Sequence, residues 1–179
     1  MDYTEKTVGA QDIYRGRIVH LHVDEVSLPD GRVSTREVVE HSGGVAIIPV
    51  DADGSVYCVR QYRYALGCHL LEIPAGKLNE GEDPFECAVR ELSEETGFTA
   101  DNYVSMGFFY PSAGYCHEKI YIYLATGLHR GEAHLDEGEF LDVEKYPLAE
   151  LVRMAENNEL YDGKTALAVL RTERYLKKS

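Results

Sequence analysis

The residues best suited to chemistry are glutamates that recur at short, fixed spacing around Arg90. Glu91, Glu94 and Glu95 fall within about one turn of a predicted helix, where three carboxylates repel one another and add nothing to a core. Oxygen donors at this density suit a hard divalent cation such as Mg2+, which shares the phosphate oxygens of a substrate. The alternative is a solvated acidic helix face, because adjacent glutamates are common on exposed helices.

The helix that must position these glutamates has recognisable ends. Asp83 is a typical N-cap, Pro84 suits the first helical position, and Gly97 suits the position just beyond the last turn. We expect the three glutamates to lie on the face opposite a buried stripe. The side chains that recur at helical spacing and predict this stripe are Phe85, Ala88, Val89, Leu92 and Thr96.

The spacing of the whole segment matches the Nudix box at every defined position. Gly76 is followed, after five residues, by Glu82 and, after seven more, by Arg90-Glu91-Leu92-x-Glu94-Glu95-x-Gly97-Phe98. The chain therefore resembles the Nudix hydrolases, enzymes that cleave nucleoside diphosphates linked to another group. This motif is far more specific than a pair of glutamates alone.

The resemblance implies a role for each residue of the box. Glu91 and Glu95 would bind Mg2+, or Mn2+ as a substitute, together with the backbone carbonyl of Ala75. Glu94 would bind through water or hold a second ion, and Arg90 would orient the glutamates by charge-assisted hydrogen bonds. The residues that would support this site are Gly76, Glu82 and Gly97.

Segments outside the box narrow the resemblance to ADP-ribose pyrophosphatases and related ADP-sugar hydrolases. These segments are Arg36–His41, Arg60–Arg63, Leu71–Gly76 and Tyr110–Gly114. One position departs from the subgroup, which usually carries a proline fifteen residues after the box, where this chain has Ala113. ADP-ribose, giving AMP and ribose 5-phosphate, is the leading substrate, and ADP-glucose, GDP-mannose or another nucleotide sugar is the alternative.

A polar loop after the predicted strand Lys119–Ala125 carries Glu137 and Glu139. A loop on a rigid scaffold can bring a carboxylate over a bound metal ion. The matching loop of ADP-ribose pyrophosphatases supplies the catalytic base and sometimes a metal contact. Glu137 is therefore the first candidate for the base, and Glu139 is the second candidate and a possible metal ligand. The alternative is an acidic loop that is merely solvated.

Four further residues are candidates for substrate binding. Arg36 and Arg63 could clamp phosphate or ribose through their forked donors, or form ordinary ion pairs at strand edges. Glu118 matches a position near the distal ribose in related enzymes, and it could equally pair with Lys119 or Arg63. Gly114 would preserve a turn of the substrate site.

Composition limits the classes of partner. The net charge of −13 argues against a general affinity for nucleic acid. No apolar run reaches the roughly 18 residues of a membrane span, and the N-terminus lacks a secretion signal, so we expect no membrane partner and a cytoplasmic protein. A non-catalytic module that binds a nucleotide sugar as a regulator is the alternative from another class.

Hydrophobic patterning predicts an α+β fold with helices packed on a mixed sheet, and the resemblance implies the Nudix α/β/α sandwich. Residues 1–42 are expected to form an antiparallel β arm that makes a homodimer, and residues 43–179 the hydrolase domain. The predicted helices are 84–96, Leu148–Asn157 and Thr165–Leu176, the last capped by Asp162. The predicted strands are Ile13–Ser27, Val33–Glu40, Gly44–Val50, Ser55–Gln61, His69–Ile73, Tyr103–Phe109, Lys119–Ala125 and Phe140–Lys145.

Overall fold

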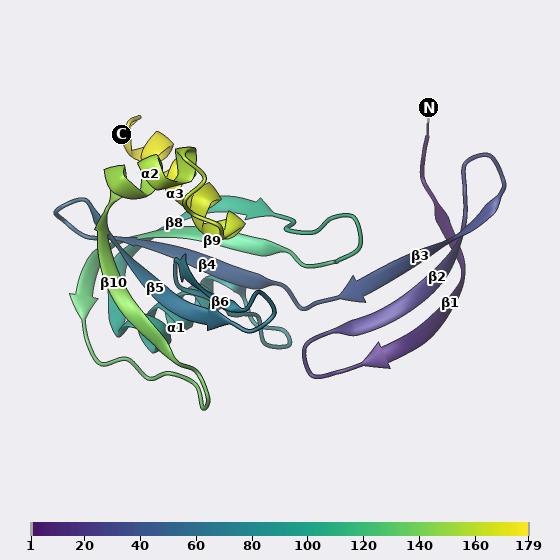
Figure 1. Ribbon diagram of the computed structural model, residues 1–179, viewed down its shortest axis with the longest axis horizontal. Coiled ribbons are helices and arrows are strands. Elements are labelled where there is room, and N and C mark those ends of the chain that lie inside the picture. The colour runs from purple at the N-terminus through teal and green to yellow at the C-terminus, as the bar shows by residue number, and fades with distance from the viewer. Residues whose placement is uncertain (1, 179) are drawn as a thin grey trace. The chain divides into compact units, whose positions relative to one another are not determined.

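The computed structural model describes residues 2–178 and divides into two compact units (Figure 1). The N-terminal unit comprises the chain up to Gly43 together with Tyr110–Lys119, and the larger unit comprises Gly44–Phe109 and the chain from Ile120 onward. In chain order the elements are β1 (Lys6–Arg15), β2 (His20–Ser27), β3 (Val33–Glu40), β4 (Gly44–Val50), β5 (Ser55–Arg63), β6 (Cys68–Glu72), β7 (Ala75–Lys77), α1 (Pro84–Thr96), β8 (Phe98–Phe109), β9 (Ile120–Arg130), β10 (Leu141–Pro147), α2 (Leu148–Glu156) and α3 (Gly163–Leu176).

The N-terminal unit is built on the antiparallel sheet β1-β2-β3. The prediction of one continuous strand from Ile13 to Ser27 is wrong, because the chain bends at Arg17 and Ile18 and separates β1 from β2. Nearly every residue of β1 is exposed, so the strand has no apolar alternation that could reveal it. The segment 110–119 joins this unit through backbone hydrogen bonds on both sides of Val39, from Val39 N to Tyr115 O and from His117 N to Val39 O.

The larger unit contains a mixed sheet in the order β10-β5-β4-β9-β8, with β6 paired to β5 and β7 paired to β4. The pair β4–β9 is parallel, and the other pairs are antiparallel. Every residue of β4 is buried, as its continuous apolar run predicts. Helices cover both of its faces, which confirms the α/β/α arrangement (Figure 1).

Successive residues of β4 pack alternately into two separate hydrophobic cores. Ala46 and Ile48 pack with residues of α2 and α3, including Leu151 and Val169. Val45 and Ile47 pack on the other side with Cys87, Ala88 and Leu92 of α1. This double packing fixes α1, and therefore the box glutamates, against a fully buried strand.

The helix ends follow the sequence signals. Asp83 accepts a hydrogen bond from Phe85 N at 2.8 Å, and Gly97 ends α1 with a left-handed φ of 72°. Asp162 caps α3 through Thr165 N. No helix within residues 2–178 is long and apolar enough to span a bilayer.

The predicted faces of α1 need a correction. Phe85 is 46% exposed rather than buried, and Glu95 is only 3% exposed. Glu95 follows Leu92 by three residues and Ala88 by seven, so it shares their face of the helix. The expectation that all three glutamates lie opposite the apolar stripe is therefore wrong for Glu95.

Candidate functional site

Glu95 lies beneath the backbone that connects β6 to β7. Within residues 2–178 its carboxylate accepts one hydrogen bond, from Ala75 N at 3.2 Å. Burial raises the pKa of Glu95 to about 8, and the charges of Glu139 and Glu91 act in the same direction. A buried carboxylate with one donor favours a positive partner, because buried charges are stable when they are paired or bound to metal.

Glu91 lies against the backbone of β7 at Gly76. A Cβ atom at position 76 would come within 1.8 Å of the Glu91 carboxyl carbon, so only glycine leaves room for this side chain. Burial, together with the charges of Glu94 and Glu139, raises the pKa of Glu91 in spite of Arg90. The first glycine of the box therefore makes space for a carboxylate.

Arg90 binds three of the box glutamates at once. Its Nε and Nη2 donate to Glu82 at 2.8 and 3.0 Å, and its Nη1 donates to both Glu91 and Glu94 at 2.7 Å. The hydrogen bonds from Arg90 lower the pKa of Glu82 to about 2. Glu82 thus holds the guanidinium in place, and the guanidinium holds Glu91 and Glu94.

The loop between β9 and β10 is tied to the C-terminal end of α1. Gly131 N donates to Gly97 O at 2.7 Å, and His134 N donates to Glu94 O at 2.9 Å. Further along this loop, Gln61 of β5 donates to Glu139 at 3.2 Å. The charge of Glu139 raises the pKa of both Glu91 and Glu95, whereas Glu137 is exposed.

Arg63, predicted to bind substrate, forms an ion pair with the buried Glu72. Its Nε and Nη2 donate to Glu72 at 2.6 and 2.7 Å, and Lys164 of α3 contacts the same carboxylate. Burial alone would raise the pKa of Glu72, but the hydrogen bonds from Arg63 and the charge of Lys164 outweigh it and leave the pKa lowered. Nη1 of Arg63 makes no hydrogen bond within residues 2–178, and the Arg63 side chain is 40% exposed.

Three residues with these contacts, Gln61, Glu72 and Lys164, were not predicted as site residues from the sequence. An isolated glutamate in the apolar run Leu70–Ile73 was the available signal for Glu72, because a buried carboxylate requires a cationic partner. The partner cation could not be identified from sequence, since Lys164 lies about ninety residues further along the chain.

The other predicted substrate residues belong to the N-terminal unit. Arg36 forms a bidentate ion pair with Glu5, at 2.9 and 2.5 Å, and also donates to Thr35 O. Glu118 lies 3.6 Å from His41 Nδ1. Gly114 is exposed in the turn that follows Pro111.

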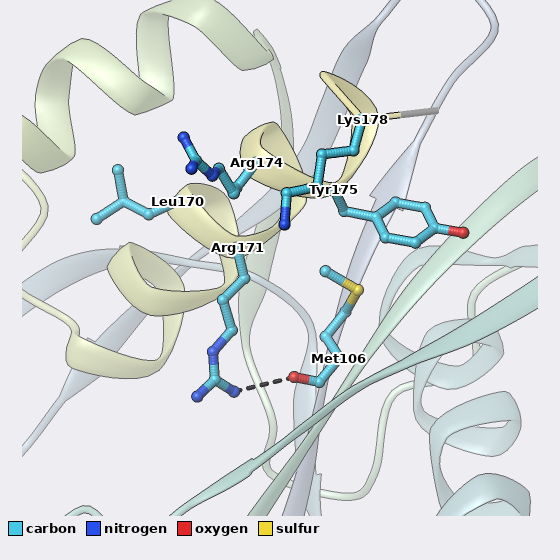
Figure 2. A pocket seen from close by; sticks show the side chains of 6 residues that line it. All are labelled: Met106, Leu170, Arg171, Arg174, Tyr175 and Lys178. Atoms are coloured by element: carbon cyan, nitrogen blue, oxygen red, sulfur yellow. Dashed lines mark hydrogen bonds between the residues drawn. The ribbon is translucent and has the colours of Figure 1, made fainter.

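A cavity of about 410 Å³ elsewhere in the larger unit has a different character. Figure 2 shows Arg171 reaching the carbonyl of Met106, at 3.0 Å, beside Arg174, Tyr175 and Lys178. Its lining is apolar and cationic, without a carboxylate. Arg174 lies in the last turn of α3, where a positive charge complements the helix dipole. A contribution to the stability of α3 is therefore sufficient to explain an arginine at this position.

The box glutamates form an oxygen-rich site that suits a hard cation. Glu91 and Glu95 offer carboxylates beside β7, where Ala75 N donates to Glu95, and Glu94 and Glu139 are close enough for their charges to act on Glu91. Within residues 2–178 no three histidine, cysteine or acidic side chains already converge as metal ligands. A cation would have to compete with Arg90 for Glu91 and Glu94.

Two family models match almost the whole chain. Residues 40–167 match the NUDIX domain, and residues 5–39 match the nucleoside diphosphate sugar hydrolase N-terminal domain. An ADP-ribose pyrophosphatase of Bacillus subtilis is 41% identical, over 92% of this chain and 90% of that protein. A methanol dehydrogenase activator of Bacillus methanolicus is 43% identical, over 93% and 91%.

The fold has a counterpart among solved structures. The crystal structure of an ADP compounds hydrolase superposes with a TM-score of 0.86 and 23% identity, covering 97% of this chain and 95% of that one. This likeness concerns the fold alone. Because the NUDIX match covers most of the chain, including the whole glutamate site, the protein belongs to the NUDIX domain family.

Proposed function

We propose that this protein hydrolyses the diphosphate of a nucleoside diphosphate sugar, and that ADP-ribose is its substrate. In this reaction water adds to one phosphorus, the bond between the two phosphates breaks, and the products are AMP and ribose 5-phosphate. The observation that carries the proposal is the pair of glutamates on α1 that lie against β7, with Glu95 buried and the Glu91 side chain 12% exposed. The match to a nucleoside diphosphate sugar hydrolase N-terminal domain and the identity to an ADP-ribose pyrophosphatase support the substrate class.

Enzymes of this family typically depend on a divalent metal ion. We propose Mg2+, with Mn2+ as a substitute, because the site offers only oxygen donors. Glu91, Glu95 and the carbonyl of Ala75 would hold the ion, and Glu94 would bind through water or hold a second ion. When bound, such an ion polarises the diphosphate and offsets the charge that develops on its oxygens.

Other residues would orient the glutamates and accept a proton. Arg90 would hold Glu91 and Glu94 through the hydrogen bonds that it already makes, and Glu82 would hold Arg90. For the general base we favour Glu139 over Glu137, because the charge of Glu139 acts on Glu91 and Glu95 and its carboxylate is oriented by Gln61.

We also propose that a cationic side chain of the protein contacts the substrate phosphates. Arg63 is the proposed residue in the larger unit, because Glu72 fixes its guanidinium while leaving Nη1 for a phosphate oxygen. Arg36, Glu118 and Gly114 stay proposed contacts in the N-terminal unit. Arg36 would have to exchange its hydrogen bonds with Glu5 for bonds to the substrate.

The proposal is tested by incubating the protein with ADP-ribose and Mg2+ and measuring AMP by chromatography. ADP-glucose and GDP-mannose, compared by kcat/KM, test the choice of substrate. A preference of tenfold or more for a non-adenine sugar, about 1.4 kcal/mol of discrimination, would overturn ADP-ribose and leave the hydrolase intact. Binding without products under Mg2+ or Mn2+ would indicate a regulator instead.

A further inference from the structure

The segment from Glu72, the last residue of β6, to Ala75, the first residue of β7, is called the strap here. It includes Ala75, whose backbone carbonyl is a proposed metal ligand. Ile73 and Pro74 are buried and lie outside regular strands, so their backbone groups need specific partners. Pro74 O accepts from Ile47 N at 2.8 Å, and Ala75 N donates to Glu95 at 3.2 Å. The strap therefore positions the backbone of Ala75, and through the Ala75 N–H it holds the carboxylate of Glu95.

The remaining backbone donor of the strap is satisfied by a side chain of α3. Ile73 N donates to Thr165 Oγ1 at 2.9 Å, in a fully buried contact between residues far apart in sequence. The hydroxyl of Thr165 donates in turn to Asp162 at 2.5 Å. Because the proton of Thr165 is committed to Asp162, its oxygen faces Ile73 as an acceptor.

The side chain of Glu72 is held from the same turn of α3. Lys164 contacts the Glu72 carboxylate, and it also lies 3.0 Å from Asp162 Oδ2. Asp162 is thus the common partner of Lys164 and Thr165. Three residues at the start of α3 fix both the side chain at one end of the strap and the amide that follows it.

We propose that Asp162, Lys164 and Thr165 are positioning residues for the metal site, which act through the Glu72–Ala75 strap on the carbonyl of Ala75 and on Glu95. The inference rests on the proposed function, because it assigns these residues a purpose in metal binding. Changing an outer partner of a metal ligand typically weakens metal affinity by about 10- to 100-fold.

The decisive variant is Thr165→Val, which keeps the shape of the side chain and removes the hydroxyl. Thr165→Ser restores the hydroxyl. Thr172→Val is the matched control, because Thr172 is equally buried on α3 and its hydroxyl has no hydrogen-bond partner within residues 2–178. Thermal denaturation of each variant establishes that it is folded.

The main measurement is the affinity of the substrate-free protein for Mn2+, followed by electron paramagnetic resonance. We expect Thr165→Val to bind Mn2+ about 10- to 100-fold more weakly, and Thr165→Ser and Thr172→Val to bind within about twofold of the wild type. With Mg2+ in excess, the KM of Thr165→Val for ADP-ribose should stay near that of the wild type. Only the Mg2+ concentration for half-maximal rate should rise.

Undiminished Mn2+ affinity in folded Thr165→Val would overturn the inference, and so would an equal loss in Thr172→Val. If Thr165→Val does not fold, Lys164→Met takes its place. The charge of Lys164 also acts directly on Glu95, so its loss alone would strengthen cation binding, and only weaker Mn2+ binding supports the inference. The control for Lys164→Met is Lys177→Met, which removes an exposed ion pair with Glu173 at the other end of α3. A wild type that binds Mn2+ without hydrolysing any nucleotide sugar would defeat the proposed function, and the comparison among variants would still decide the positioning role.

Discussion

Substitution of Gly76 by alanine should separate activity from stability. A Cβ atom at this position would lie 1.8 Å from the Glu91 carboxyl carbon and 1.9 Å from Oε1, whereas ordinary contacts begin near 3.4 Å. The carboxylate must therefore move by about 1.6 Å or more. Because the clash involves the far end of a flexible side chain, Glu91 can rotate away without distorting the strand.

The functional cost of that rotation should be large. A displacement of about 1 Å in a reacting or positioning group can lower a rate by roughly 100-fold. The backbone itself favours the substitution, since alanine in place of glycine at a compatible conformation stabilises by about 0.4–1 kcal/mol through the unfolded state. We therefore expect kcat/KM for ADP-ribose to fall by roughly 100-fold or more while the melting temperature changes little.

Gly9→Ala is the matched control. A Cβ atom at Gly9, also in a strand, would lie 3.2 Å from a carboxylate oxygen of Glu25, a neighbour outside the glutamate site. This variant should retain wild-type kinetics. The reasoning about Glu91 is refuted if Gly76→Ala is as active as the wild type, or if its activity is lost only together with its folded structure in thermal denaturation.

Other perturbations test separate parts of the site. Glu95→Gln should lower turnover roughly 100-fold or more with an unchanged circular dichroism spectrum, and full activity would contradict its assignment as a ligand. Glu139→Ala should lower kcat by about 100- to 10,000-fold at nearly constant KM, and the opposite pattern, with only Glu137→Ala impaired, would exchange the two roles. The lowered pKa of Glu72 means that its ion pairs stabilise the fold fully above the usual value of 4.5, and this stabilisation is lost as the pH falls from there through the lowered pKa of the folded state. In denaturant unfolding near neutral pH, Glu72→Gln should accordingly be about 3 kcal/mol less stable than the wild type. At acidic pH the two proteins should have similar free energies of unfolding, and a difference that does not change with pH would exclude this linkage. Light scattering should give twice the 20.1 kDa chain mass if residues 1–42 form a dimerising arm, and a monomer at assay concentration would reject that proposal.

Elements whose own residues determine their structure could be predicted from the sequence. β4 is apolar throughout because helices cover both of its faces, and α1 is delimited by Asp83 and Gly97. β1 could not be predicted, because its exposed residues form a strand only by pairing with β2, with register shifts near Thr7 and Asp12. The three-residue strand β7 likewise exists through its pairing with β4.

Some features of the candidate site could likewise be predicted from the sequence, and others could not. The identities of its glutamates follow from the spacing of the box, and so does the pairing of Arg90 with Glu94 four residues later. The burial of Glu95 depends on the backbone of β7 closing over it, and the partners of Glu72 come from α3. Such contacts join segments that are far apart in the sequence, so neither the secondary-structure propensity nor the periodicity of one segment predicts them.

The hydrogen bonds of Arg90 give the glutamate cluster an internal counter-ion. Glu82, Glu91 and Glu94 all contact this one guanidinium, so mutual repulsion among them is offset within the protein itself. Many small metal-binding domains stay unfolded until their ion arrives. Here Arg90 supplies a positive charge from the chain itself, so these three carboxylates are paired without an ion. In the proposed metal site, the affinity for an ion would then be set by exchange between two kinds of positive charge, a fixed arginine and a mobile cation.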